Sequence, residues 1–114
     1  MNVGDPSVTG TVYYFGRMAD LAQILSEAGF SVRVGSWAIR LDQFASVFKL
    51  AYVGNLRPDS PFDVVCEGDD FPVDVLATNC ERLAACLQRN SIGFDFTHFS
   101  GDEDQELRTY TYQP

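Results

Sequence analysis

Two stretches of helical spacing, set among strand-like runs, restrict the fold of this chain more than any other pattern in its sequence. In the first stretch, apolar residues from Met18 to Ala28 recur at intervals of three and four, as on one face of a helix. Gly29 follows, and Leu25 and Phe30 are placed to form the apolar contact of a Schellman ending. This pattern predicts a helix over residues 17–28.

The second helical stretch has a less definite beginning. Thr78 and Glu81 have the spacing of a capping box, which favours a start near Thr78. A start at Asp74 is the alternative, and it adds Val75 and Leu76 to the helix. The predicted apolar stripe consists of Cys80, Leu83, Ala84 and Leu87.

The other patterned segments are rich in β-branched and aromatic residues, and they predict strands. Gly35-Ser36 lies where the alternation of residues 30–41 changes phase, which favours a type II′ hairpin turn over a bulge in one long strand. Residues 47–53 are apolar on both faces except for Lys49, as in a strand covered on both sides. The predicted strands are 11–15, 30–34, 37–41, 47–53, 62–67, 94–99 and 106–112.

These elements predict an α+β fold with the order β-α-β-β-β-β-α-β-β, in which two helices cover one face of a mostly antiparallel sheet. We expect one globular domain over residues 1–114, with a flexible lead over 1–10. The segment 54–61 contains Gly, Asn, Asp and two prolines, and we interpret it as the connection between two halves. The halves share a Leu-Ala-x-x-Leu pattern at an offset of 62 residues, so an internal duplication is possible.

Charge is distributed unevenly along the chain. The 16 acidic and 8 basic residues give a formal net charge of −8. Residues 1–57 contain four acids and five bases, a net charge of +1, whereas residues 58–114 contain twelve acids and three bases, a net charge of −9. Part of this excess lies in two segments, 67–74 and 102–106. If these segments lie at the same end of the sheet, they form one negative patch that attracts a cationic protein.

This patch is the candidate partner-binding site. Tyr110 and Tyr112 share one side of the last predicted strand, next to the second acidic segment, and tyrosine is a common anchor in interfaces. The alternative is that both tyrosines only cover the sheet. The predicted partner-binding residues are Asp69, Asp70, Asp102, Glu103, Asp104, Glu106, Tyr110 and Tyr112.

Catalytic, metal and cofactor signatures are missing from the sequence. His98 is the only histidine, and no local motif places a nucleophile beside it. The acidic segments lack EF-hand spacing, and no phosphate-binding glycine motif occurs. The scattered Lys and Arg residues argue against nucleic acid as a partner. We therefore expect a protein that is not an enzyme and has no metal or cofactor.

The cysteines and apolar runs give an expectation for the compartment. The spacing of Cys66, Cys80 and Cys86 matches neither a disulfide framework nor a zinc site, so we expect buried, reduced thiols. No apolar run approaches the ~20 residues of a membrane span, and residues 1–10 do not resemble a secretory signal. These features favour a cytoplasmic protein that does not contact membranes.

Two resemblances and one further class give the functional hypotheses. A small acidic α+β domain without catalytic residues is similar in kind to the immunity proteins of bacterial competition systems, which cover the basic cleft of a nuclease toxin with carboxylates. The leading hypothesis is such an inhibitor, a monomer or weak homodimer when free. The order of elements also resembles the βαβββ modules of the vicinal-oxygen-chelate enzymes, which implies a small-molecule-binding or lyase-like domain. A phage-type acidic inhibitor that mimics DNA is the further alternative.

Overall fold

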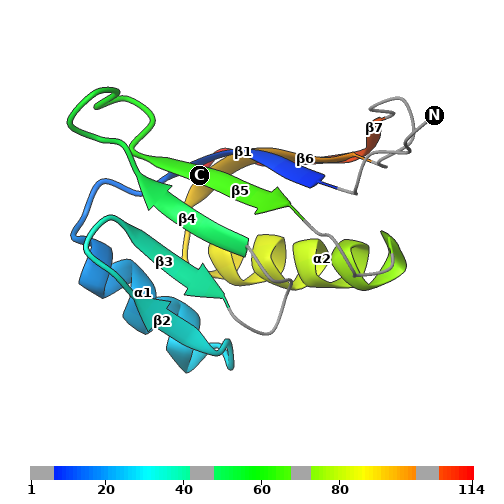
Figure 1. The fold of residues 1–114 in the computed structure, drawn as a ribbon, viewed down its shortest axis with the longest axis horizontal. Helices are drawn as coiled ribbons and strands as arrows, with labels where there is room; N and C mark the ends of the chain where they lie inside the picture. Colours follow the sequence, from blue (N-terminus) through cyan, green and yellow to red (C-terminus); the bar gives the residue numbers. More distant parts are fainter. Residues whose placement is uncertain (1–6, 42–47, 68–72, 100–105) are drawn as a thin grey trace.

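The computed structural model describes residues 7–41, 48–67, 73–99 and 106–114 of the chain (Figure 1). The order of its elements confirms the predicted α+β class and the predicted succession of helices and strands. In chain order they are β1 (Ser7–Tyr13), α1 (Met18–Glu27), β2 (Val32–Val34), β3 (Ala38–Leu41), β4 (Phe48–Tyr52), β5 (Phe62–Glu67), α2 (Val73–Arg89), β6 (Gly93–Phe99) and β7 (Glu106–Tyr112).

All seven strands belong to one antiparallel sheet with the order β2-β3-β4-β5-β1-β6-β7. Figure 1 shows both helices on the same side of this sheet, with α1 under β2 and β3 and α2 under β6 and β7. In the described part of the chain the other face of the sheet carries no helix. We call it the open face. Neither described helix is long and apolar enough to cross a membrane.

The first strand is central in the sheet and begins earlier than predicted. β1 starts at Ser7 and pairs with β5 on one side and with β6 on the other. The expected flexible lead over 1–10 is therefore wrong for residues 7–10, and residues 1–6 lie outside the described part. Gly10 interrupts the strand-like composition, but its position between Val64 and Phe96 requires a residue without a side chain.

The first helix ends as the sequence predicts. Gly29 has a φ of +98°, a conformation that favours glycine. The N–H of Phe30 donates to the carbonyl oxygen of Leu25 at 3.1 Å, and the N–H of Gly29 donates to that of Ser26 at 3.1 Å. These two hydrogen bonds form a Schellman motif. It turns the chain sharply into β2 and places Phe30 in the core.

The hairpin turn between β2 and β3 lies one residue later than predicted. Val34 pairs with Ile39, and the N–H of Gly35 donates to the carbonyl oxygen of Ala38 at 2.8 Å. Ser36 and Trp37 are therefore the two turn residues, in place of Gly35 and Ser36. This shift takes Trp37 out of the strand and leaves its side chain 67% exposed.

The second helix begins at Val73, close to the alternative start at Asp74, and the capping role of Thr78 is wrong. The Thr78 hydroxyl donates to the carbonyl oxygen of Asp74 at 3.0 Å, which is a bond within the helix. The helix ends like α1: Ile92 donates its N–H to Leu87 at 2.9 Å, and Ser91 has a φ of 57°. The earlier start brings Leu76 into the buried stripe.

The segment 54–61 joins β4 to β5, two strands that pair directly through Tyr52 and Phe62. It is therefore a hairpin loop within the sheet. After α1 the chain returns at the sheet edge as β2, whereas after α2 it returns as β6, next to the central strand. The strand that follows each helix thus has a different place, and the topology gives no support for a duplication. All described strands lie in one sheet, so they enclose no pocket between two sheets.

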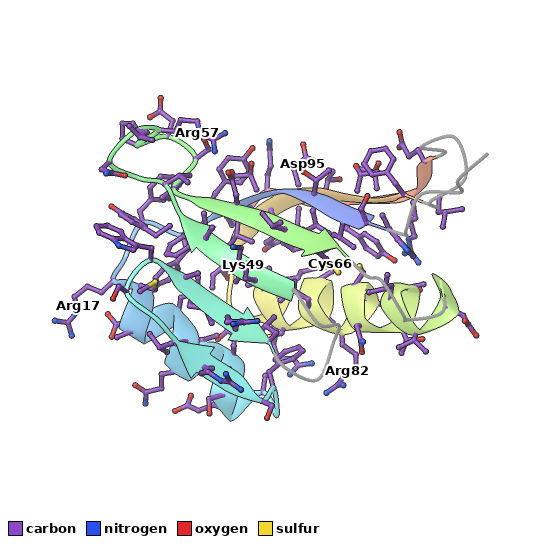
Figure 2. All side chains as sticks on the ribbon, viewed as in Figure 1. Arg17, Lys49, Arg57, Cys66, Arg82 and Asp95 are labelled. Atoms are coloured by element: carbon purple, nitrogen blue, oxygen red, sulfur yellow. The ribbon has the colours of Figure 1, made fainter. Side chains whose placement is uncertain are left out.

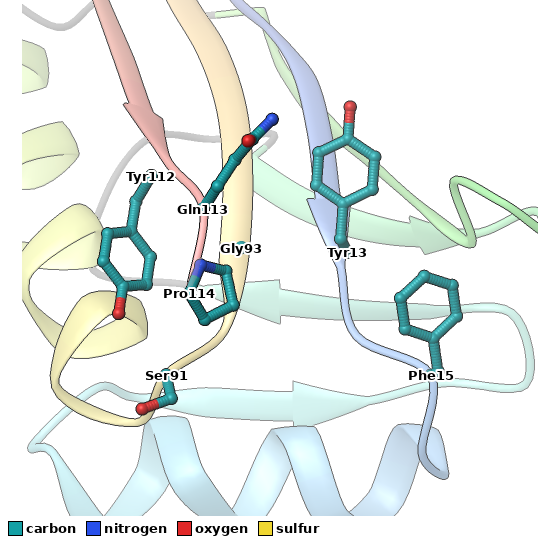
Figure 3. Close-up of a pocket in the computed structure, with 7 residues that line it drawn as sticks. All are labelled: Tyr13, Phe15, Ser91, Gly93, Tyr112, Gln113 and Pro114. Atoms are coloured by element: carbon teal, nitrogen blue, oxygen red, sulfur yellow. The ribbon is translucent and has the colours of Figure 1, made fainter.

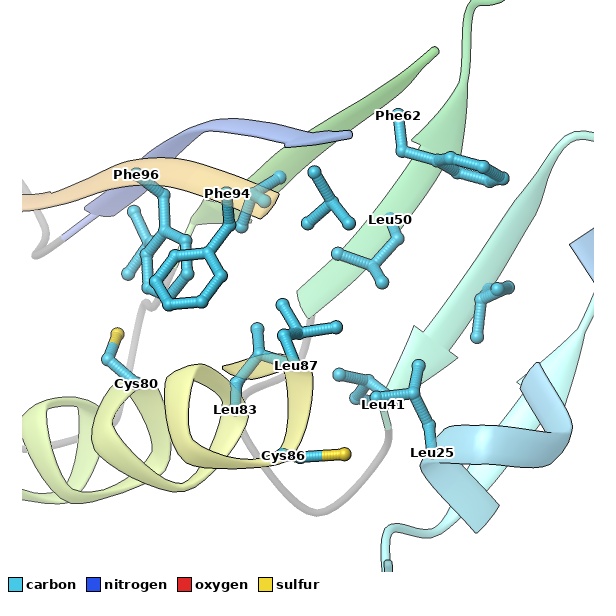
Figure 4. Close-up of a cluster of buried hydrophobic side chains, with 14 of the residues drawn as sticks. Leu25, Leu41, Leu50, Phe62, Cys80, Leu83, Cys86, Leu87, Phe94 and Phe96 are labelled. Atoms are coloured by element: carbon cyan, nitrogen blue, oxygen red, sulfur yellow. The ribbon is translucent and has the colours of Figure 1, made fainter. Parts of the chain in front are cut away.

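The hydrophobic core lies between the sheet and the two helices (Figure 4). Leu25 of α1 and Leu83 of α2 are fully buried, as are Leu50 and Phe96 from the sheet. Burying each such side chain stabilises the fold by about 1.5–3 kcal/mol. In β4 only one face is covered, because Lys49 and Ala51 lie on the open face and are partly exposed. The prediction that this strand is covered on both sides is wrong.

Candidate functional site

Four strand ends meet at one end of the sheet. Ser7 of β1 pairs with Glu67 of β5 on one side and with Phe99 of β6 on the other, and Phe99 pairs with Glu106 of β7. Neighbouring strands are about 4.8 Å apart, so these four backbone positions span about 14 Å. We call this row the acidic end. Residues 68–72 follow β5 directly, and residues 100–105 connect β6 to β7.

The two chain segments that adjoin the acidic end are strongly acidic in sequence. Residues 67–74 and 100–106 contain eight of the 16 acidic residues and no lysine or arginine. The described strands β5, β6 and β7 flank these segments, and the strand ends next to them lie in one row, with β1 between β5 and β6. Whether the two segments form one patch stays a prediction, since residues 68–72 and 100–105 lie outside the described part.

Few of the predicted site residues can be placed individually. Glu106 is exposed, and its Oε1 accepts a hydrogen bond from the Thr109 hydroxyl at 2.6 Å. Asp74 belongs to the first acidic segment but is not among the predicted site residues; it lies in the first turn of α2 and is also exposed. The remaining predicted carboxylates lie outside the described residues: Asp69, Asp70, Asp102, Glu103 and Asp104.

Tyr110 and Tyr112 do not flank the acidic end as expected. Tyr110 is 5% exposed, its ring stacks on Phe96, and its hydroxyl donates to the carbonyl oxygen of Ala77 at 3.4 Å. Its ring is therefore part of the core under α2, where it offers no surface to a partner. Tyr112 packs against Phe94 at the far end of β7, six residues from Glu106, which is about 20 Å along a strand. Both tyrosines cover the sheet, as the alternative predicted.

One arginine lies near the acidic end, and it already has partners. Arg108 donates to Glu81 of α2 at 2.7 Å, and its guanidinium lies 4.7 Å from the centre of the Tyr110 ring. Both partners of the ion pair are more than half exposed, so the pair adds little stability. The pair links β7 to α2, and the Glu81 carboxylate partly neutralises the Arg108 guanidinium.

The titratable groups of the core are poorly suited to nucleophilic chemistry. His98 is 1% exposed, its Nε2 has no hydrogen-bond partner, and burial lowers its pKa. Val8 lies between His98 and Cys66 in the sheet, so the two side chains stand two strands apart. Burial raises the pKa of Cys80 to about 12. A thiol with that pKa is almost entirely protonated at neutral pH and is a weak nucleophile.

Within the described ranges, no group of three or more His, Cys, Asp or Glu side chains could hold a metal ion. The three cysteines are buried and none of them forms a disulfide, as predicted.

A basic row on the open face is a feature that no sequence pattern predicted. Arg33 pairs with Arg40, and Arg40 pairs with Lys49, across three neighbouring strands. Directly opposite side chains in a sheet lie about 5 Å apart, so three positive charges stand side by side. On the other half of the open face Figure 2 shows Asp95, on the side away from the helices. The alternation of buried residues in each strand could have identified this row once the strand order was known.

A second unpredicted feature is a group of aromatic side chains at the opposite end of β1. Phe15 is 70% exposed, and two hollows of about 400 and 440 Å³ meet at its ring. The first hollow also includes Tyr13 and Tyr112 (Figure 3), and the second includes Trp37 and Tyr52. We call these five residues the aromatic end.

Comparison of the chain with protein-family models, with curated proteins and with solved structures finds no match.

Proposed function

We propose that this chain is a non-enzymatic binding protein that holds a basic protein partner at its acidic end. The observation that carries the proposal is the register of the sheet, which places Glu67, Ser7, Phe99 and Glu106 in one row. Both acid-rich segments adjoin this row. A partner at this end therefore meets charge from two segments, residues 67–74 and 100–106, that are separate in the chain.

The electrostatics support a basic partner over other classes. The segments 67–74 and 100–106 together contain eight carboxylates and no lysine or arginine, and such a concentration of negative charge raises the association rate of a cationic protein and repels nucleic acid. The only described arginine near the row is already paired with Glu81. Both acidic segments adjoin strand ends that lie in one row, which favours a patch over the extended ridge that a DNA mimic requires.

More specifically, we propose that the chain is an immunity-type inhibitor that covers the basic cleft of a nuclease toxin. The small size, the charge of −8 and the place of the acidic segments in the sequence, after β5 and between β6 and β7, support it. Nuclease clefts bind phosphates with clustered Lys and Arg, so a carboxylate patch is complementary to them. The residues that we assign to the contact are Asp69, Asp70, Asp102, Glu103, Asp104 and Glu106.

Charge reversal with a matched control tests this assignment. In the site variant Asp102, Glu103 and Asp104 become lysine; in the control the exposed residues Glu27, Asp59 and Asp95 become lysine. Each reversal changes the charge by two, so both variants have a net charge of −2 in place of −8. The tagged proteins are used to capture partners from cells of the source organism at low salt, and the captured proteins are identified by mass spectrometry.

We expect the wild type and the control to retain the same basic protein, and the site variant to lose it. The captured protein should be released by salt, because exposed charge pairs are screened. If it is a nuclease, the wild type and the control should inhibit it and the site variant should not. Equal capture by all three proteins, or loss from both variants alike, would contradict a local acidic site.

A further inference from the structure

The aromatic end differs from the rest of the described surface in how much apolar ring it exposes. Phe15 is 70% exposed and Trp37 is 67% exposed, whereas the rings of Phe62, Phe94 and Phe96 are buried. The two exposed rings come from the β1–α1 connection and from the β2–β3 turn, and they line the same hollow. Exposed apolar groups that gather in this way mark interaction sites.

The shape of this surface is a double trough. Figure 3 shows the rings of Tyr13 and Phe15 along one side of the first hollow and Tyr112 with Pro114 along the other. Gly93 lies between them, and a Cβ on it would come within 3.3 Å of Pro114, so the absence of a side chain keeps the floor low. The second hollow continues beyond Phe15 toward Trp37 and Tyr52. The Phe15 ring is thus a ridge between two adjoining apolar depressions.

Several side chains around the trough can donate hydrogen bonds. The hydroxyls of Tyr13, Tyr52 and Tyr112 and the indole N–H of Trp37 can donate. Arg17 also lines the second hollow, and its Nε lies 3.5 Å from Oδ2 of Asp20. None of the described residues that line the two hollows is acidic, although the whole chain has a net charge of −8. A ligand that fits this lining has apolar rings, and its carbonyl oxygens accept hydrogen bonds from these side chains.

Two features favour an extended peptide over a small molecule. Small-molecule sites enclose most of their ligand, whereas the walls of this trough project into solvent. The trough lies across the ends of β1, β4, β6 and β7, so a peptide in it has no free strand edge along its length to pair with. A polyproline II helix needs no such edge, presents its carbonyls outward, has no N–H donors at its prolines and is recognised by aromatic grooves.

We propose that the aromatic end binds a proline-rich segment of a partner in the polyproline II conformation, with proline rings in the two hollows on either side of Phe15. Tyr and Trp donors hold the peptide carbonyls. The site is separate from the acidic end, because Ser7 and Tyr13 stand at opposite ends of β1.

Trp37 supplies the test, since it is the only tryptophan in the chain and lines the second hollow. The full-length protein is titrated with a decaproline peptide and, separately, with a Gly-Ser peptide of equal length, while the Trp37 emission is recorded. We expect a saturable change with decaproline alone. Phe15→Ala should weaken binding about tenfold, an effect of about 1.4 kcal/mol. Since Phe15 is mostly exposed, this variant should fold, which circular dichroism verifies.

Leu56→Ala is the matched control, because Leu56 is 80% exposed and lines neither hollow. It should leave the affinity for decaproline unchanged within about twofold. Three results would overturn the proposal: no saturable change with decaproline, an equal response to the Gly-Ser peptide, or equal weakening by both variants. None of them bears on the acidic end, so failure here is distinct from failure of the basic-partner proposal.

Discussion

Gly10 provides the most demanding test of the sheet, because the structure leaves no space for a side chain there. A Cβ at this position would lie 2.2 Å from the carbonyl oxygen of Asp95, 2.3 Å from Cα of Phe96 and 2.5 Å from its Cβ. Two of these three atoms belong to the backbone of β6, so a rotamer change cannot relieve the clash. For Gly10→Ala, β1 and β6 must separate by almost 1 Å to reach even the shortest contacts that real Cβ atoms make.

The expected cost is large because β1 is hydrogen-bonded on both sides. Overpacking of a core costs about 1–3 kcal/mol, and this site has no flexible neighbour, so we expect about 3 kcal/mol or more. For a chain of this size that corresponds to a decrease in Tm of roughly 10–15 °C. Gly35→Ala is the control, because its Cβ would meet only the carbonyl oxygen of Ala38 at an ordinary 3.5 Å.

Urea denaturation followed by far-ultraviolet circular dichroism measures both variants. Trp37 is a poor reporter of unfolding, since it is largely exposed in the folded state. A free energy of unfolding for Gly10→Ala within about 0.5 kcal/mol of the wild type, the range of ordinary surface changes, would refute the central position of β1 between β5 and β6.

Three further predictions concern α2 and the buried titratable groups. Thr78→Ala should change the free energy of unfolding by less than about 0.5 kcal/mol, since Thr78 lies inside the helix; a loss near 1 kcal/mol in urea denaturation would instead indicate a cap. Burial lowers the pKa of His98 below its ordinary value, so the unfolded chain binds a proton first and stability should fall as the pH decreases below about 6.5, until the lower folded-state pKa is passed. His98→Leu should remove this part of the pH dependence in unfolding curves measured between pH 5 and 8; an unchanged profile would exclude His98 as its source. The three buried cysteines, including Cys80 with its pKa of about 12, should react with a thiol reagent only after denaturation, and rapid reaction of the native protein would contradict their burial.

Local patterns predicted those parts of the fold that local interactions determine. The bounds of β5 and β7 were predicted correctly, and Gly29 marked the end of α1 through a Schellman motif whose partners are all within six residues. The start of α2 was less certain, because Thr78 and Glu81 match a capping box even though the helix continues through them. Such a motif is only a local signal, and burial of Leu76 favours the longer helix.

Features that depend on distant partners could not be predicted in the same way. Gly10 suggests a flexible lead in the sequence, and only its neighbours Val64 and Phe96 explain why a glycine stands inside a strand. Tyr110 and Tyr112 alternate correctly, but the sequence does not say which face of the last strand α2 covers. The two hollows at the aromatic end are lined by segments near residues 13–18, 36–37, 52, 91–93 and 112–114, and no local pattern connects these segments.

Binding of a basic partner at the acidic end can be tested directly by nuclear magnetic resonance of the isotope-labelled chain with its captured partner. The account predicts that the partner shifts the backbone amide signals of Ser7, Glu67, Phe99 and Glu106, the four positions that the register places in one row. Shifts confined to the aromatic end, or to the basic row of Arg33, Arg40 and Lys49, with the signals of the acidic end unchanged, would contradict it.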